Sequence, residues 1–470
     1  MSTNHILVEE EQKKAKRVPQ YIAAFSVCLG SLCSGSILGW TGNTAEELLD
    51  GSFNDISIDD ESLGWIGSLV NIGAMLSCIA IGPLCEYMGR KYGMLILVIP
   101  FTAGWLLVIF AQNVYMIYIG RLLGGFAGGC FSLSAPQYVS ETAQKDIRGA
   151  LSTFAELLLA VGVTIAYVLG FVVSAKVTAI VLAIFPIIFA IVFMTQPETP
   201  YYLLKRNRDD EASRSLQRLR GRLYDTSDEL KQIRSDIEED RANELPALQS
   251  FKKRETKIAT SVSIGLMFFH QACGINAIVF YASSIFAAAG IDESVLSPGI
   301  SAIIVGIAQV VGNCASTLLI ERLGRRTLLI LSGLFMAIPE VLLGMFFTFQ
   351  DRDILSSDTL SMIGFLPILS LCVFVISSEM GYGPVAWIIS VEMFPAEARS
   401  ILIAGTGAFN RFVSFLVTRF YLNMQNSLGG DVTFYIFASI SFAGAAFPFF
   451  FAPETKGKSL VEIQRELRGK

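Results

Sequence analysis

The stretch Phe268-Phe-His-Gln-Ala-Cys-Gly-Ile-Asn-Ala-Ile-Val-Phe-Tyr281 lies inside an apolar run that extends from Ile258 to Ala289. This run is long enough to cross a bilayer, because about 20 helical residues span the hydrocarbon core. It nevertheless carries His270, Gln271 and Asn276, and a polar group left unpaired in lipid costs several kcal/mol. These side chains are therefore expected to face a cavity, a ligand or another helix.

Two interpretations of this polar stretch remain open. Amide groups both donate and accept hydrogen bonds, as hydroxyl groups do, so Gln271 and Asn276 suit a neutral ligand with many hydroxyl groups. Gly274 lies between them and permits close approach or local unwinding of the helix. The alternative is that the amides hold two membrane helices together.

The rest of the chain has the composition of a polytopic membrane protein. Of its 470 residues, 53% are hydrophobic and 16% are charged, and long charge-free runs recur from end to end. We predict an all-α protein with twelve transmembrane helices, near 19–40, 64–84, 92–111, 114–139, 149–173, 176–195, 257–289, 296–320, 327–349, 360–390, 398–424 and 431–452. The eight cysteines lie in or at the ends of these runs, so we expect neither a metal site nor another cofactor.

The charges of the connecting segments predict an orientation. The segment Thr41–Leu63 after the first run has seven acidic residues and no Lys or Arg. Basic residues gather in the connections on the other side, of which the stretch 205–257 is the longest. Because cytoplasmic loops carry an excess of Lys and Arg, both termini are predicted to be cytoplasmic.

Motifs of the first half recur in the second. The repeated elements are Gly89 and Gly324, Glu141 with Arg148 and Glu392 with Arg399, and Pro197-Glu-Thr and Pro453-Glu-Thr. Such spacing predicts two parallel six-helix halves with the ligand site between them. The expected organisation is a cytoplasmic tail (1–18), an N-terminal half (19–200), a cytoplasmic linker of two or three short amphipathic helices (201–256), a C-terminal half (257–452) and a cytoplasmic tail (453–470).

The tenth run contains its own helix breaker. Gly383 and Pro384 stand together in Gly381-Tyr-Gly-Pro-Val-Ala-Trp387. Broken membrane helices are tolerated mainly where they line a cavity or a moving part. We therefore predict a gate on this helix.

Taken together, these motifs resemble the sugar porter branch of the major facilitator superfamily over residues 20–465, and within it the arthropod facilitated trehalose and glucose transporters. His270-Gln-Ala-Cys-Gly-Ile-Asn276 resembles the signature Gln-Gln-x-x-Gly-x-Asn of helix seven. Gln196-Pro-Glu-Thr-Pro-Tyr-Tyr-Leu-Leu204 resembles a Pro-Glu-Ser-Pro-Arg-Tyr-Leu motif, and Gly120-Arg121 also fits the family. The resemblance implies the major facilitator fold and a small-molecule sugar as cargo.

The resemblance also implies which residues line the sugar site: Gln271, Asn276, Gln309, Glu379, Trp387 and Asn410. A sugar ring offers hydroxyl groups to the amides and an apolar C–H face to the indole. His270 and Glu156 stand where the family commonly has glutamine. They lie within hydrogen-bond reach of each other or of one sugar hydroxyl, or else His270 replaces a glutamine while Glu156 pairs elsewhere.

A second set of residues is predicted to act in gating. It consists of Glu86, Arg90, Arg121, Glu141, Arg148, Glu321, Arg325, Glu392 and Arg399, together with Gly383 and Pro384. The family uses charges at helix ends as ion pairs that form in one state and separate in another. Anchoring of basic residues at the cytoplasmic surface is the alternative, but it does not account for the acids.

We therefore predict a facilitator of neutral sugar transport that works by alternating access, as a monomer, in the plasma membrane. The first run lacks the aspartate of proton-coupled members, which favours uniport over proton symport. A sugar-sensing receptor on a transporter scaffold is a third candidate. We expect neither enzymatic activity nor a nucleic-acid partner, and the lipid bilayer is the other expected contact.

Overall fold

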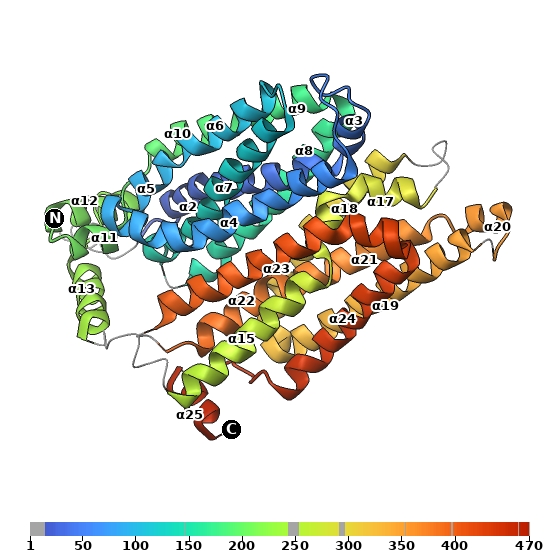
Figure 1. The fold of residues 1–470 in the computed structure, drawn as a ribbon. Coiled ribbons are helices and arrows are strands. Elements are labelled where there is room, and N and C mark those ends of the chain that lie inside the picture. Colours follow the sequence, from blue (N-terminus) through green and yellow to red (C-terminus); the bar gives the residue numbers. More distant parts are fainter. Residues whose placement is uncertain are drawn as a thin grey trace, which may run out of the picture.

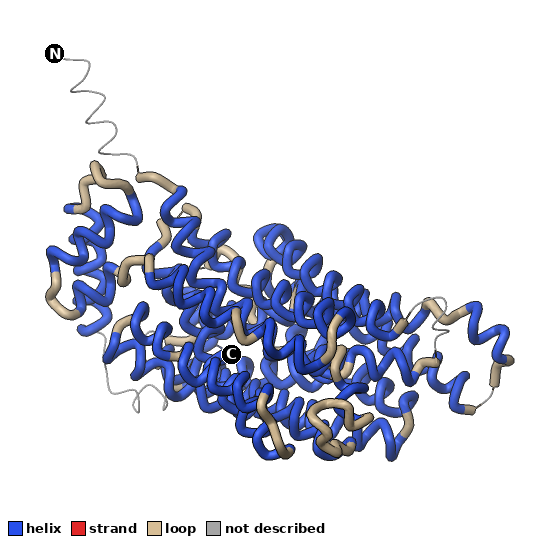
Figure 2. Tube along the Cα trace, turned by 90° about the horizontal axis from the view of Figure 1, so that it is seen from above, coloured by secondary structure: helices blue, strands red, loops and turns tan. Residues whose placement is uncertain are grey.

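The computed structural model describes residues 15–144, 146–242, 253–290, 297–352, 354–395, 398–458 and 460–469. Within these ranges the chain forms helices joined by loops, with no β-strand (Figure 2). Twelve of the helical stretches have the length and the apolar composition that a membrane crossing requires. The prediction of an all-α chain with twelve spans is confirmed.

The helices form two groups that lie side by side (Figure 1). The N-terminal group contains α2 (Val18–Gly39) with the 3₁₀ turn η1 (Trp40–Gly42), α4 (Asp60–Met88), α5 (Arg90–Ile96), α6 (Val98–Ile109), α7 (Val114–Thr142), α8 (Arg148–Val172), α9 (Ala175–Leu182) and α10 (Phe185–Met194). The C-terminal group contains α15 (Arg254–Ala272), α16 (Ile275–Phe280), α17 (Ala282–Ala288), α18 (Pro298–Leu323), α19 (Arg325–Asp351), α21 (Leu366–Met380), α22 (Tyr382–Met393), α23 (Arg399–Leu428) and α24 (Gly430–Phe450). Helix α4 packs on α23, and α8 packs on α18, so both pairs join one group to the other.

The two ends of the bundle differ in charge and in the elements they carry. One end, here called the acidic end, bears the short helix α3 (Ala45–Leu49) within the acidic connection, and α20 (Ser357–Met362). The other end, here called the linker end, bears α11 (Pro200–Lys205), α12 (Asp209–Arg220), α13 (Ser227–Ala242) and α25 (Leu460–Gly469). The predicted short helices between the halves are thus observed, whereas α25 was not foreseen in the predicted tail.

Hydrogen bonds join the two groups near the acidic end. Arg419 on α23 donates to Glu61 on α4 at 3.0 Å, and Asn43 donates to the carbonyl of Gly299 at 3.1 Å. The hydroxyl of Ser283 donates to the carbonyl of Gly42 at 2.6 Å. In Figure 1 the groups approach each other at this end and diverge toward the linker end. The structure therefore holds the halves together on one side of the bundle.

The seventh span is broken at Gly274, a position where the sequence permits close approach or local unwinding. Gly274 directly precedes α16 and has φ +91°, in the left-handed region. A Cβ atom added there would lie 2.8 Å from the ring of Phe437. Both the backbone conformation and the close approach of Phe437 require glycine at this position.

We expect Gly274→Ala to destabilise the protein by about 1–3 kcal/mol, the usual cost of a left-handed non-glycine residue. A lower thermal unfolding midpoint in detergent checks this. Gly405→Ala is the matched control, because a Cβ at Gly405 meets no atom within 4 Å. Equal midpoints for the two variants would contradict the assignment.

The tenth span is broken at Gly381, which separates α21 from α22. Its backbone has φ −125° and ψ −80°, and an added Cβ would lie 2.3 Å from Cβ of Ser332 on α19. Gly383 and Pro384 follow in the first turn of α22, where a proline is tolerated. The predicted break is therefore present, two residues before the glycine–proline pair, and its role as a gate stays a prediction.

Candidate substrate site

The amides of the helix-seven stretch form a hydrogen-bonded cluster with α23. Gln271 Nε2 donates to Asn410 Oδ1 at 3.1 Å. Asn276 Nδ2 lies 2.7 Å from Gln271 Oε1 and 2.6 Å from Ser414 Oγ. Asn410 Nδ2 lies 3.3 Å from Nδ1 of His270. Four of the predicted site residues are thus brought together, and Ser414 joins them.

The break at Gly274 makes this cluster possible. Side chains five residues apart on a continuous helix point in directions roughly 140° apart, at 3.6 residues per turn. Gln271 and Asn276 are five residues apart, yet their amides are hydrogen-bonded. The left-handed residue between α15 and α16 therefore turns both amides toward the same place.

A second polar group joins α18 to α21. Gln309 Nε2 donates to Glu379 Oε1 at 2.8 Å, and Asn313 Nδ2 donates to Glu379 Oε2 at 3.2 Å. Gln309 and Asn313 lie one turn apart on the same face of α18. Gln309 and Glu379 were predicted, and Asn313 is an addition that its spacing from Gln309 would have indicated.

Trp387 lies where three helices meet. A Cβ atom at Gly407 of α23 would lie 3.4 Å from the indole of Trp387 on α22 and 3.4 Å from Sγ of Cys78 on α4. Cys78 belongs to the N-terminal group, so the half-buried indole lies next to the boundary between the groups. This place fits the predicted role of an apolar platform.

Glu156 on α8 is exposed, although it lies in the interior of a predicted span. Tyr167 lies eleven residues further along, on the same helix face after about three turns. The hydroxyl of Tyr167 donates to the carbonyl of Val279 in the C-terminal group at 2.5 Å. Glu156 therefore belongs to the face of α8 that is directed at the other half.

His270 and Glu156, which stand where the family commonly has glutamine, do not contact each other directly. The hydrogen-bond partner of the His270 ring is Asn410, and within the described residues Glu156 is not within hydrogen-bond distance of His270. The hypothesis of a direct pair is thus not supported. The other interpretation, in which His270 replaces an amide, matches the observed contact.

Arg411 was missed by the sequence reading. It follows Asn410 on α23, is half-buried, and its charge acts on both Glu156 and His270. No ion-pair partner of its guanidinium is found among the described residues. An arginine in the middle of an apolar run is itself a signal, because ionisable groups inside membranes usually mark functional places. Glu156 and Arg411 bring opposite charges from the two halves toward one region.

At the linker end, four of the residues predicted to act in gating form two ion pairs, each within one half. Arg90 lies 2.9 Å from Glu141, which joins α5 to α7. Arg325 lies 3.4 Å from Glu392, which joins α19 to α22. The same relation in both halves agrees with the predicted repeat.

The other predicted gating residues have different partners. Glu86 pairs with Lys205 of α11 at 2.7 Å. Arg148 Nη2 lies 3.4 Å from the carbonyl oxygen of Ala143, and Arg399 Nη2 lies 3.3 Å from that of Phe394. The side chain of Glu321 lies outside the described residues. Arg148 and Arg399 are thus bonded to main-chain carbonyls five residues before them.

Arg121 differs from its predicted role as an ion-pairing residue. Its guanidinium is fully buried and donates to the carbonyls of Ile37 at 2.6 Å and Ile66 at 3.0 Å. It also lies over the ring of Trp40, 5.4 Å from the centroid. Since its observed partners are carbonyl groups and an indole, Arg121 joins α7 to α2 and α4 toward the acidic end.

The repeated Pro-Glu-Thr motifs have a structural explanation that the sequence did not supply. Glu198 accepts hydrogen bonds from the backbone N–H groups of Arg90 and Lys91, at the start of α5. Glu454 accepts from the N–H groups of Arg325 and Arg326, at the start of α19. Burial raises the pKa of the Glu198 carboxyl, and its backbone donors oppose that shift. Each carboxylate therefore caps a helix of its own half.

The family model described as "Sugar (and other) transporter" matches residues 8–467. The chain belongs to this family. It is therefore a multi-pass integral membrane protein of a transporter family and not an enzyme, and the resemblance drawn from the motifs is confirmed.

Relatives within the family include insect proteins named facilitated trehalose transporter Tret1. The one from Aedes aegypti is 35% identical over 452 residues, which cover 96% of this chain and 55% of the relative. The one from Culex quinquefasciatus is also 35% identical, over 96% of this chain and 86% of the relative. The chain thus spans little more than half the length of some relatives and most of others.

Solved structures of a sugar transporter share the fold. The xylose transporter XylE from E. coli, in a partially occluded inward open conformation, matches with a TM-score of 0.77 at 21% identity over 94% of this chain and 99% of that chain. The proton:xylose symporter XylE bound to 6-bromo-6-deoxy-D-glucose matches with a TM-score of 0.76 at 22% identity over 95% and 99%. The fold of this family member is that of the major facilitator superfamily.

Proposed function

We propose that this chain carries a neutral sugar, trehalose or a hexose such as glucose, down its gradient by alternating access. The observation that carries the proposal is the hydrogen-bonded cluster of Gln271, Asn276 and Asn410 at a helix break inside the membrane. The names of the insect relatives support trehalose as the first sugar to examine.

The cluster is suited to exchange its own hydrogen bonds for those of a sugar. A hydroxyl group donates and accepts, so it can replace either partner in the chain Asn276–Gln271–Asn410 without leaving an amide unpaired. Because the hydrogen bonds broken and formed are similar in kind, binding and release of the sugar both have a small net free-energy cost. Trp387 would supply the apolar face that a sugar ring requires.

We further propose that residues 19–200 and 257–452 move as two bodies connected by the linker 201–256. The linker end with both tails faces the cytoplasm, because the acidic connection carries no Lys or Arg between Thr41 and Leu63. The hydrogen bonds between halves near the acidic end support a state closed to the outside. Both halves supply residues to the site, so a single chain suffices, and the plasma membrane is the proposed location.

Arg148 and Arg399 are the residues expected to stabilise the opposite state. In this structure they bond only to carbonyls among the described residues, so each guanidinium is able to pair with a carboxylate when the linker end closes. We expect Arg148→Ala or Arg399→Ala to raise labelling of cavity cysteines from the linker end and to lower it from the acidic end. Unchanged labelling from both sides would contradict this role.

Proton-coupled symport is the second candidate, because Glu156 and Glu379 place carboxyl groups within the spans. Uptake of labelled trehalose, glucose and fructose into proteoliposomes containing the purified chain distinguishes the two. The proposal predicts equilibration of at least one sugar, unaffected by a protonophore. Accumulation that collapses with the protonophore would assign symport, and failure to transport any sugar would overturn both.

A further inference from the structure

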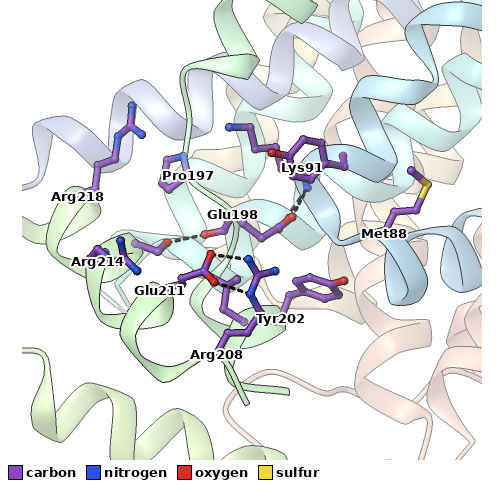
Figure 3. A pocket seen from close by; sticks show the side chains of 12 residues that line it. Met88, Lys91, Pro197, Glu198, Tyr202, Arg208, Glu211, Arg214 and Arg218 are labelled. Carbon is purple, nitrogen blue, oxygen red and sulfur yellow. Dashed lines mark hydrogen bonds and ion pairs between the residues drawn. The ribbon is translucent and has the colours of Figure 1, made fainter. Parts of the chain in front are cut away.

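A pocket of about 330 Å³ lies at the linker end, away from the candidate substrate site (Figure 3). Its walls are the end of α4, the beginning of α5, the connection between α10 and α11, and the helices α11 and α12. All lining residues belong to the N-terminal half and the linker, so the pocket does not depend on contact between the halves.

The acidic groups of this pocket are already engaged. Glu198 accepts hydrogen bonds from the backbone N–H groups of Lys91 and Thr199, at 3.0 and 2.9 Å. Glu211 forms two hydrogen bonds with the guanidinium of Arg208, at 2.7 and 2.5 Å. Figure 3 shows the contact of Glu198 with Lys91 and the pairing of Glu211 with Arg208. Glu211 is thus paired with a cation, whereas Glu198 is held by backbone N–H groups and its charge also attracts Lys91.

The pocket lining has four cations against two carboxylates, and three of these cations form no direct ion pair among the described residues. Arg214 donates to the carbonyl of Asp210 at 3.2 Å, and Arg218 donates to the carbonyl of Thr195. The ammonium group of Lys91 lies 5.8 Å from the centroid of the Tyr92 ring. Among the described residues none of the three is seen to pair with a carboxylate, and the charges of Lys91 and Arg218 repel each other. The excess positive charge around this hollow would attract an anion placed between them.

The surroundings of the pocket indicate where such an anion comes from. The third span begins at Arg90 and the sixth ends at Met194, so Lys91 and Thr195 lie where spans leave the apolar layer. Tyr92 is 59% exposed and Met194 is 61% exposed, and apolar side chains exposed beside a span face lipid. The pocket is therefore at the level of the lipid head groups.

We propose that this pocket binds the phosphorylated head group of a membrane lipid, held by Lys91, Arg214 and Arg218. A phosphate monoester carries close to two negative charges near neutral pH and has three acceptor oxygens, which matches three cations better than a singly charged head group does. The bound lipid would join α5 in the bundle to α12 in the linker. The inference rests on the proposed cytoplasmic placement of the linker end, where anionic lipids gather, and not on the identity of the sugar.

Thermal unfolding of the purified full chain in detergent tests the site without any sugar. The probes are dioctanoyl phosphatidylinositol 4-phosphate, dioctanoyl phosphatidylserine, dioctanoyl phosphatidylcholine and the soluble head group inositol 1,4-bisphosphate. We expect a saturable rise of the unfolding midpoint with the first lipid, a smaller rise with the second and none with phosphatidylcholine. If inositol 1,4-bisphosphate raises the midpoint as much as its lipid does, the ligand is not specifically a lipid. If all lipids raise the midpoint equally, the pocket does not recognise the phosphorylated head group, and the proposal is wrong.

Variants locate the effect. Arg214→Gln with Arg218→Gln is expected to weaken binding of phosphatidylinositol 4-phosphate about tenfold or more, as the loss of charged hydrogen bonds implies. Arg222→Gln with Lys231→Gln is the matched control, since both residues are exposed on the linker outside the pocket. Lys91→Gln keeps the backbone hydrogen bonds to Glu198, so it is the alternative test variant if the double variant unfolds. Wild-type affinity in both Lys91→Gln and the double variant would refute the proposal.

Discussion

Replacing Gln271 with alanine is expected to lower sugar uptake by about one to two orders of magnitude at low sugar concentration. Gln271 stands at the centre of the cluster, because it donates to Asn410 and accepts from Asn276. Its removal takes away a partner of the bound sugar and leaves both neighbouring amides short of one bond, a loss of about 1–3 kcal/mol. Initial uptake rates and equilibrium binding of labelled trehalose to the purified variant measure the effect.

The comparison variants separate a binding defect from a folding defect. Asn276→Ala removes one arm of the cluster and is expected to have a smaller effect in the same direction. Gln112→Ala, in an exposed connection at the acidic end, makes a similar change outside the site and is expected to leave uptake unchanged. If folded Gln271→Ala protein, judged by its unfolding midpoint, binds and transports sugar normally, the amide cluster is not the sugar site.

Neutralising Arg411 or Glu156 alone is expected to reduce uptake about tenfold or more, whereas neutralising both restores most of it. The two charges attract each other between the helix groups without a direct ion pair, so each single change leaves one charge without its counterpart beside a neutral ligand. The double change removes both charges and leaves amide groups, which suit a neutral sugar. Residues coupled in this way show interaction energies of about 0.5–3 kcal/mol in double-mutant cycles.

The measurement is uptake by Glu156→Gln, Arg411→Gln and the double variant, with Lys176→Gln as a control in an exposed position at the acidic end. Uptake of a charged sugar tests directly which charge a single substitution leaves in the site. Glu156→Gln leaves the positive charge of Arg411 in place. Uptake of a sugar acid such as glucuronate is therefore expected to be higher in this variant than in the wild type. Strictly additive losses in the double variant would show that the two charges act independently.

The sequence was sufficient to predict the architecture, because the relevant signals are local. Apolar runs of about 20 residues follow directly from the thickness of a bilayer. The breaks at Gly274 and Gly381 were indicated by glycine beside polar residues or proline. The repeated Pro-Glu-Thr motifs revealed the two halves, although not the reason for them, since capping of α5 by Glu198 depends on a contact between distant segments.

The site was predicted only in part, and the omissions have a common cause. Asn313, Ser414 and Arg411 become site residues through the faces of α18 and α23 that they occupy, and helix rotation is set by packing. Arg121 shows the opposite case, because an intramembrane arginine suggested an ion pair while carbonyl groups supply its partners. The contact between His270 and Asn410 likewise depends on how α15 meets α23.

Counterflow tests the central claim, a sugar carrier with alternating access, most directly. Proteoliposomes containing the purified chain are loaded with concentrated unlabelled trehalose and diluted into a trace of labelled trehalose, and the experiment is repeated with glucose. A carrier whose site opens to one side at a time exchanges outgoing unlabelled sugar for incoming label. The account therefore predicts a transient accumulation of label above its equilibrium level with at least one sugar, abolished in Gln271→Ala. Label that never exceeds equilibrium with either sugar, or an overshoot that Gln271→Ala leaves intact, would contradict it.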